Sequence, residues 1–153
     1  REENVEGEGA VDLATLVKWG LRMNPDRVIV GEVRGGEALD LVKVWGTGHP
    51  GGIATIHSGS ALGALLRLEQ LILEVAVNPP RALIAEAVNV VIHIAGRGRK
   101  RRVESIARVV GFDGVGYRLA DALETPFPEL MPVPLAADAA APSPSPDQSG
   151  ELP

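Results

Sequence analysis

The chain has 153 residues, 45% of them hydrophobic and 23% charged, with a formal net charge of −5 and no cysteine. This length and composition predict one soluble globular domain with a hydrophobic core, and the absence of cysteine excludes disulfides and thiolate metal sites. No apolar run approaches the ~18 residues of a membrane span, and no basic-then-apolar leader opens the sequence. Because the sequence begins at Arg1 in a charged, glycine-rich stretch, we expect a fragment whose N-terminal part is missing.

The first half of the chain predicts helices that alternate with short strands. Asp12 and Ser60 are placed to cap two of the helices, and Pro25 lies beyond the end of the first. The apolar run 27–30 predicts a strand buried on both faces, as in a parallel sheet. The expected elements are a helix over 13–21, the strand 27–30, a helix over 38–45, a strand over 52–57 and a long helix from 61 to about 78. Such alternation predicts an α/β domain with a mainly parallel sheet.

The pattern changes after residue 88. A helix over 81–88 leads into three strands, 89–96, 102–112 and 116–120, which hairpin-type turns would make antiparallel. These strands would extend or flank the sheet. Residues 125–153 hold eight of the twelve prolines and no Lys or Arg, so we expect a disordered tail there. The predicted division is therefore a folded part, 1–124, and a tail, 125–153.

Polar side chains stand where the two predicted parallel strands end. Gly31 and Glu32 follow the first strand, and His57 closes the second. In open α/β sheets, ligands bind at the carboxyl ends of the strands. A carboxylate there can orient a water for attack on a phosphate or act around Mg²⁺, and a neighbouring imidazole can contact the terminal phosphate. The residues alone fit a second interpretation equally well, in which Glu32 is an ordinary solvated residue beside a glycine-rich turn.

Two motifs in order carry a resemblance to a known family. The stretch 23–72 contains "VIVGEVRG" and "TGHPGGIATIHSGSA", and it closely resembles the traffic ATPases of the type II/IV secretion superfamily, in particular the conjugal-transfer (TrbB-type) branch. The resemblance extends over about 6–123. The "VIVGEVRG" motif is similar to a Walker B segment with Gly31 where an aspartate is usual, and the "TGHPGGIATIHSGSA" motif is similar to the histidine box. The resemblance implies a RecA-like P-loop NTPase core that uses ATP and Mg²⁺.

The same resemblance implies roles for single residues. Glu32 would act on the attacking water or on the metal shell, Arg34 would support the Walker B region, and His57 would contact the γ-phosphate. Thr47, Gly48 and His49 match the start of the histidine box, although His49 also fits an ordinary turn residue. No direct metal ligand is predicted, and His93, outside the motifs, is expected to be structural.

The chain departs from the family in one respect. No G-x-x-x-x-G-K-[ST] loop occurs in it, and "GRGRK" at 96–100 lacks both the spacing and the strand-to-helix setting of such a loop. In the family this loop precedes the Walker B segment. We therefore expect the parent protein to be an ATPase and these 153 residues alone to hydrolyse ATP poorly.

The family also implies an assembly and a location. By resemblance, the parent protein forms a hexamer in the cytoplasm, peripheral to the inner membrane, and works with secretion-channel or pilus-assembly proteins. Two alternatives remain open: a tight-adherence pilus or type II secretion assembly ATPase, and a degenerate, non-catalytic scaffold.

A basic cluster lies at the predicted hairpin turn after residue 96. It places five positive charges within six residues: Arg97, Arg99, Lys100, Arg101 and Arg102. A solvated turn explains these charges, and so does an anionic partner such as a lipid surface, a neighbouring subunit or DNA.

Overall fold

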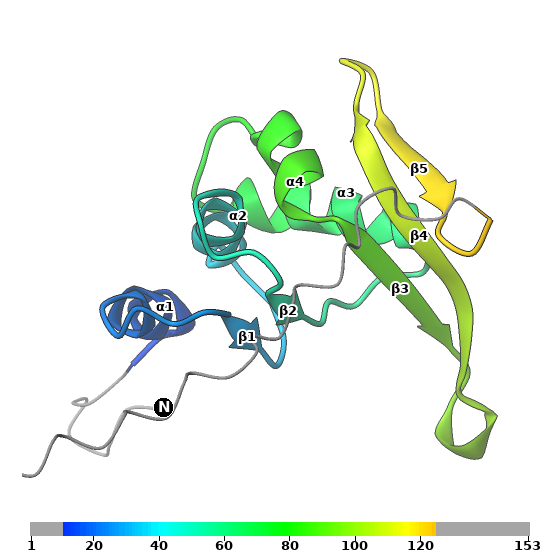
Figure 1. Cartoon of the computed structure of the whole chain (residues 1–153), viewed down its shortest axis with the longest axis horizontal. Coiled ribbons are helices and arrows are strands. Elements are labelled where there is room, and N and C mark those ends of the chain that lie inside the picture. Colours follow the sequence, from blue (N-terminus) through cyan, green and yellow to red (C-terminus); the bar gives the residue numbers. More distant parts are fainter. Residues whose placement is uncertain (1–10, 125–153) are drawn as a thin grey trace, which may run out of the picture.

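The computed structural model describes residues 11–124, which form helices and two separate small sheets (Figure 1). The tail predicted over 125–153 lies outside the described residues. In chain order the elements are α1 (Leu13–Leu21), β1 (Ile29–Val30), α2 (Ala38–Gly46), β2 (Ile53–Ala54), α3 (Ala61–Ile72), α4 (Arg81–Ala87), β3 (Val90–Ala95), the 3₁₀ turn η1 (Gly98–Lys100), β4 (Arg102–Phe112) and β5 (Tyr117–Asp121).

The parallel sheet consists of β1 and β2, in a register that pairs Ile29 with Ile53. Both strands are shorter than predicted. Val30 is buried, but Ile29 is 66% exposed and Ile53 60%. The prediction of a strand buried on both faces is therefore wrong for Ile29, because no described element covers the face that it shares with Ile53.

The antiparallel sheet has the strand order β3-β4-β5. Its strands match the three predicted runs closely, and they form a sheet of their own instead of joining β1 and β2. The tight turn between β4 and β5 is closed by Asp113, whose Oδ1 accepts hydrogen bonds from the backbone N–H groups of Val115 (2.9 Å) and Gly116 (2.8 Å). A short aspartate in this position satisfies turn amides that the ladder leaves unpaired.

The core lies where α2, α3 and α4 pack together and against the antiparallel sheet. Helix α3 begins as predicted, because the Ser60 hydroxyl accepts a hydrogen bond from the Gly63 N–H at 2.9 Å. Burying one large aliphatic side chain contributes about 1.5–3 kcal/mol. The largest fully buried side chains are Leu41, Val42, Leu65, Leu71, Ile72 and Ile84.

Helix α3 ends at Ile72, earlier than the predicted end near 78. The following turn lays Val75 against Gly36, where an added Cβ would overlap the valine side chain. A glycine at 36 thus permits the chain after α3 to fold back onto the start of α2. The sequence pattern did not show this contact, because it joins two segments far apart in the chain.

One buried charge links three elements. Glu69 on α3 is 7% exposed, and its Oε2 lies 2.9 Å from Nε of Arg81 at the start of α4. Tyr117 on β5 faces the same carboxylate, and burial together with Glu69 raises the pKa of the Tyr117 hydroxyl. The pairing with Arg81 supplies the partner that a buried carboxylate needs.

Among the described residues, no helix is long and apolar enough to cross a membrane.

Candidate nucleotide site

The two parallel strands stay side by side beyond their last ladder residues. The Val33 N–H donates to the Thr55 carbonyl at 2.9 Å, and the Thr55 hydroxyl donates to the Gly31 carbonyl. These bonds join the residues that follow β1 to those that follow β2. They bring Glu32 and His57 together at the carboxyl end of the sheet.

Glu32 lies between Arg34 and His57. Its Oε2 is 2.6 Å from Nη2 of Arg34, and its Oε1 is 2.9 Å from Nε2 of His57. The Arg34 hydrogen bond is the main cause that lowers the pKa of Glu32, with a smaller contribution from the charge of protonated His57, while burial acts in the opposite direction. Glu32 is therefore an ionised carboxylate at neutral pH.

The two oxygens of Glu32 differ in their surroundings. Arg34 donates a hydrogen bond to Oε2. The His57 imidazole is near Oε1 but not at the angle of a hydrogen bond, so this buried oxygen has no hydrogen-bond donor within the described part of the chain. A buried, ionised acceptor without a donor is suited to bind a water molecule.

Glu37 holds the loop that carries Arg34. Its Oε1 accepts hydrogen bonds from the backbone N–H groups of Arg34 (2.9 Å) and Gly35 (3.0 Å). Burial raises the pKa of Glu37, but these backbone donors outweigh it and the net shift is downward. The loop after β1 is thus fixed by a carboxylate that the sequence interpretation did not assign.

A cavity of about 280 Å³ opens at these strand ends. Arg67 reaches it from α3, and its Nη1 donates to Oε1 of Gln70 at 3.1 Å. The sequence analysis assigned Arg67 no function. One feature of the sequence indicates this position of Arg67. Helix α3 begins only a few residues after His57, so its second turn lies beside the strand end. The cavity is lined by Glu32, Val33, Arg34, Ile56, His57 and Arg67.

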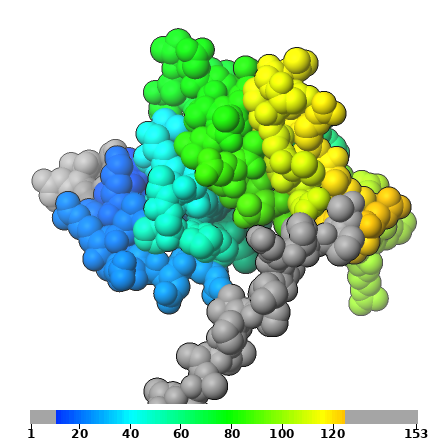
Figure 2. Space-filling view, turned by 45° about the horizontal axis from the view of Figure 1, so that its top comes forward, coloured from blue at the N-terminus to red at the C-terminus, as the bar shows by residue number. Residues whose placement is uncertain are grey.

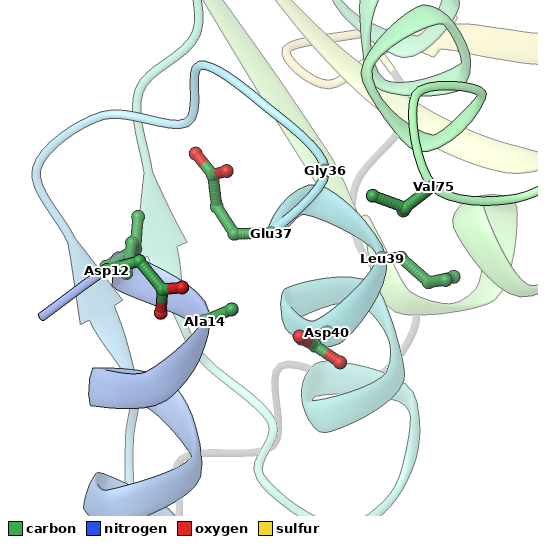
Figure 3. A pocket seen from close by; sticks show the side chains of 8 residues that line it. Asp12, Ala14, Gly36, Glu37, Leu39, Asp40 and Val75 are labelled. Atoms are coloured by element: carbon green, nitrogen blue, oxygen red, sulfur yellow. The ribbon is translucent and has the colours of Figure 1, made fainter.

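A larger cavity, of about 380 Å³, lies between α1 and the start of α2 (Figure 3). Three carboxylates line it, from Asp12, Glu37 and Asp40. Asp12 caps α1 by accepting from the Thr15 N–H at 2.6 Å, and Glu37 holds the loop described above. Among residues 11–124, no cluster of three His, Asp or Glu side chains could hold a metal ion. The hydrogen bonds of Asp12 and Glu37 give these two carboxylates structural roles.

The start of the predicted histidine box lies at the other end of α2. The Thr47 hydroxyl donates to the Lys43 carbonyl at 2.6 Å, and Gly48 follows with a φ of +109°. Neither these residues nor His49 line the cavity at Glu32, and their role stays a prediction. His93 pairs with Glu104, Nδ1 to Oε2 at 3.1 Å, in the antiparallel sheet, away from this cavity.

The fold has a solved counterpart. The crystal structure of the VirB11 ATPase from the Brucella suis type IV secretion system, in complex with sulphate, matches with a TM-score of 0.59 and 33% sequence identity. The match covers 64% of this chain and 32% of that one. With its parallel strand pair and added antiparallel strands, the chain is an α/β fragment of a RecA-like ATPase core.

Sequence comparison gives the family. The model of the type II/IV secretion system protein family matches residues 1–107, so the chain belongs to this family. The chain is 48% identical over 108 residues to the conjugal transfer protein TrbB of Rhizobium radiobacter. This match covers 71% of this chain and 33% of the relative. The chain is 37% identical over 106 residues to the type IV secretion system protein PtlH of Bordetella pertussis, with 63% and 31% covered. The resemblance stated from the two motifs is confirmed, and the chain spans about a third of the length of these relatives.

Proposed function

We propose that this chain is the C-terminal part of a secretion ATPase subunit that couples ATP hydrolysis to substrate transfer or pilus assembly in a type IV secretion system. The observation that carries the proposal is the position of Glu32 and His57. They come from two neighbouring parallel strands and meet at the strand ends, with Oε1 of Glu32 and Nε2 of His57 2.9 Å apart. Membership of the secretion family supports it.

In this proposal Glu32 orients the water that attacks the terminal phosphate. Arg34 lowers the pKa of the carboxyl, and the donor-free Oε1 accepts a proton of the water. His57 and Arg67 line the same cavity and contribute N–H donors towards the phosphate. Glu37 keeps the loop of Arg34 in place.

ATP with Mg²⁺ would supply the phosphoryl group and the metal that neutralises the developing charge. Because Glu32 is already paired with Arg34, its role in this proposal is around Mg²⁺ through a water and not as a direct ligand. The chain lacks the phosphate-binding G-x-x-x-x-G-K-[ST] loop. We therefore infer that another part of a longer protein supplies the loop and that this chain alone has little activity.

The proposed assembly is a hexameric ring in the cytoplasm, peripheral to the inner membrane and bound to secretion-channel or pilus-assembly proteins. The open site supports a ring, because the side chain of His57 is 94% exposed and a neighbouring subunit can complete its surroundings. The proposed domain division is 1–124 for the ATPase part and 125–153 for a tail.

The test is ATP hydrolysis by the longer protein that contains these residues. We expect Glu32→Gln to retain ATP binding and to lower kcat by about 10²–10⁴-fold, because it removes the charge that orients the water. Glu86→Gln, on the exposed side of α4, is the matched control and should leave kcat unchanged. Normal turnover by Glu32→Gln would contradict the role of Glu32.

Two alternatives give different results. A tight-adherence pilus or type II secretion assembly ATPase would show the same kinetics but would complement a different secretion system. A degenerate scaffold, favoured only by the missing loop and by Gly31 in place of aspartate, would neither bind nor hydrolyse ATP in the longer protein.

A further inference from the structure

The hairpin formed by β3 and β4 projects from the body of the molecule and ends in a basic tip, namely Arg97, Arg99, Lys100, Arg101 and Arg102 (Figures 1 and 2). All five residues are exposed. Within the described part of the chain, Arg102 is the only member with a carboxylate in ion-pair range, Oε1 of Glu104 at 3.5 Å. The tip is therefore a dense positive charge with almost no internal compensation.

The rest of the chain has the opposite charge. The chain has 15 Lys and Arg and 20 Asp and Glu, so removing the five residues of the basic tip leaves ten basic against twenty acidic side chains. An anionic surface would repel this remainder and attract the tip. Screening at physiological salt has a length of about 8 Å. Val91 of β3 still packs against the core, and the four strand residues after it span about 13 Å. Within residues 11–124, the part outside the tip has nine Lys and Arg against twelve Asp and Glu. The hairpin can thus bring the tip to an anionic surface ahead of a body that is mildly acidic.

Exposed aliphatic side chains lie directly behind the basic tip. Ile94 of β3 pairs with Val103 of β4, and they are 59% and 55% exposed. Paired residues point to the same side of an antiparallel sheet, and Ile92, 56% exposed, continues that side. We call Ile92, Ile94 and Val103 the apolar shoulder. Positive charge followed by aliphatic surface matches the order of headgroup and hydrocarbon at a membrane surface.

We propose that the basic tip and the apolar shoulder dock on a membrane surface that contains anionic phospholipids. The hairpin sequence favours lipid over single-stranded nucleic acid, because residues 90–111 contain no Phe, Tyr or Trp to stack on bases. Exposed Ile and Val beside the charges have no counterpart in a hydrated phosphate backbone. The inference rests on the proposed location beside the inner membrane, but it requires neither nucleotide nor hydrolysis.

The experiment measures binding of the whole 153-residue chain to two kinds of vesicle. One kind contains phosphatidylcholine only, and the other contains phosphatidylcholine and phosphatidylglycerol in equal amounts. We expect binding to the anionic vesicles alone, weakened by added salt. Each Lys or Arg near an anionic surface contributes about fivefold, so Arg99→Gln with Lys100→Gln should weaken binding about 25-fold.

Matched variants separate the tip from net charge. Lys18→Gln with Arg22→Gln removes the same charge from exposed positions at the end of α1 and should change binding far less. A second tip pair, Arg97→Gln with Arg101→Gln, repeats the test, and circular dichroism checks that each variant is folded.

Ile94→Thr tests the apolar shoulder. It keeps a β-branched residue in the strand and should weaken binding several-fold without changing the dependence of binding on salt.

Three results would overturn the proposal. Equal binding to both kinds of vesicle would show that charge does not drive binding. If the α1 variant lost as much binding as the tip variant, the basic tip would not be the binding surface. Tighter, salt-dependent binding to duplex DNA that both tip pairs abolish would assign the tip to nucleic acid. None of these results bears on ATP hydrolysis, so failure here leaves the proposed enzyme untouched.

Discussion

Glu32 shows how one carboxyl is tuned by its neighbours. Arg34 is the largest influence on its pKa and His57 the smallest. We expect Arg34→Gln to raise the pKa of Glu32, because the variant removes both the charged hydrogen bond and the positive charge. The pKa is measured by following the Glu32 side-chain carboxyl with pH by NMR.

His57→Gln is the comparison for that titration. It removes only the weaker influence and should raise the pKa of Glu32 less than Arg34→Gln does. A larger shift from His57→Gln would mean that the imidazole, and not the guanidinium, has the larger influence on the pKa of Glu32.

Asp113 makes the stability of the β4–β5 turn depend on pH. Backbone hydrogen bonds from Gly116 and Val115, followed by Arg118, lower the pKa of Asp113 from 3.8 to about 2. Because the folded pKa is the lower one, the carboxylate stabilises the fold fully above 3.8, and this contribution is lost as pH falls towards 2. Asp113→Asn should therefore lower Tm at neutral pH, and the gap to the wild type should narrow in acid. A gap of constant size down to pH 2 would show that the charge has no part in the turn.

At this scale the sequence predicted which residues meet at the strand ends. Glu32 and His57 were predictable, because residues that end two parallel strands meet at one edge of a sheet. Arg67 and Glu37 were not, because their roles depend on which way a helix face and a loop side chain turn in three dimensions. Thr47 to His49 carry a motif, but α2 separates them from the cavity.

At the scale of elements, Gly52 permits the contact between α2 and β2. The Trp45 indole crosses its backbone and lies near the Val28 carbonyl, Nε1 to O at 3.4 Å, and a Cβ at 52 would overlap the ring. We expect Gly52→Ala to destabilise the protein by about 1–3 kcal/mol, because the ring has to move.

Gly59→Ala is the matched control for this substitution. An added Cβ at Gly59 meets nothing within 4 Å, and chemical denaturation should show a change within about 0.5 kcal/mol. If both variants unfold at the same denaturant concentration, the Trp45 ring does not require a glycine at position 52.

Element types were predicted better than element ends. Helix caps are local, so Asp12 and Ser60 identified the starts of two helices. The ends that were wrong depend on distant contacts. Helix α3 stops early where Val75 meets Gly36, and Ile29 is exposed because no described element covers it.

At the scale of the whole molecule, the strand types were predicted but not their grouping. Local alternation separates parallel from antiparallel strands, yet it does not say which strand lies beside which. The structure keeps β3, β4 and β5 in a sheet apart from β1 and β2, and α3 and α4 pack against this second sheet (Figure 1). The link between the helices and this sheet includes Glu69, Arg81 and Tyr117, which belong to three different elements.

The described core ends with β5, and this sets where the chain can be shortened. Val109 of β4 is buried in the core, and its partner Leu119 of β5 packs against it. We expect deletion of residues 125–153 to change the free energy of unfolding by no more than about 0.5 kcal/mol, because it removes none of these contacts. Deletion from residue 117 onward should instead abolish cooperative melting, because it removes β5 and exposes Val109. Calorimetry of both truncated chains tests the boundary at 124, and a large loss of stability in the shorter deletion would place part of 125–153 in the folded unit.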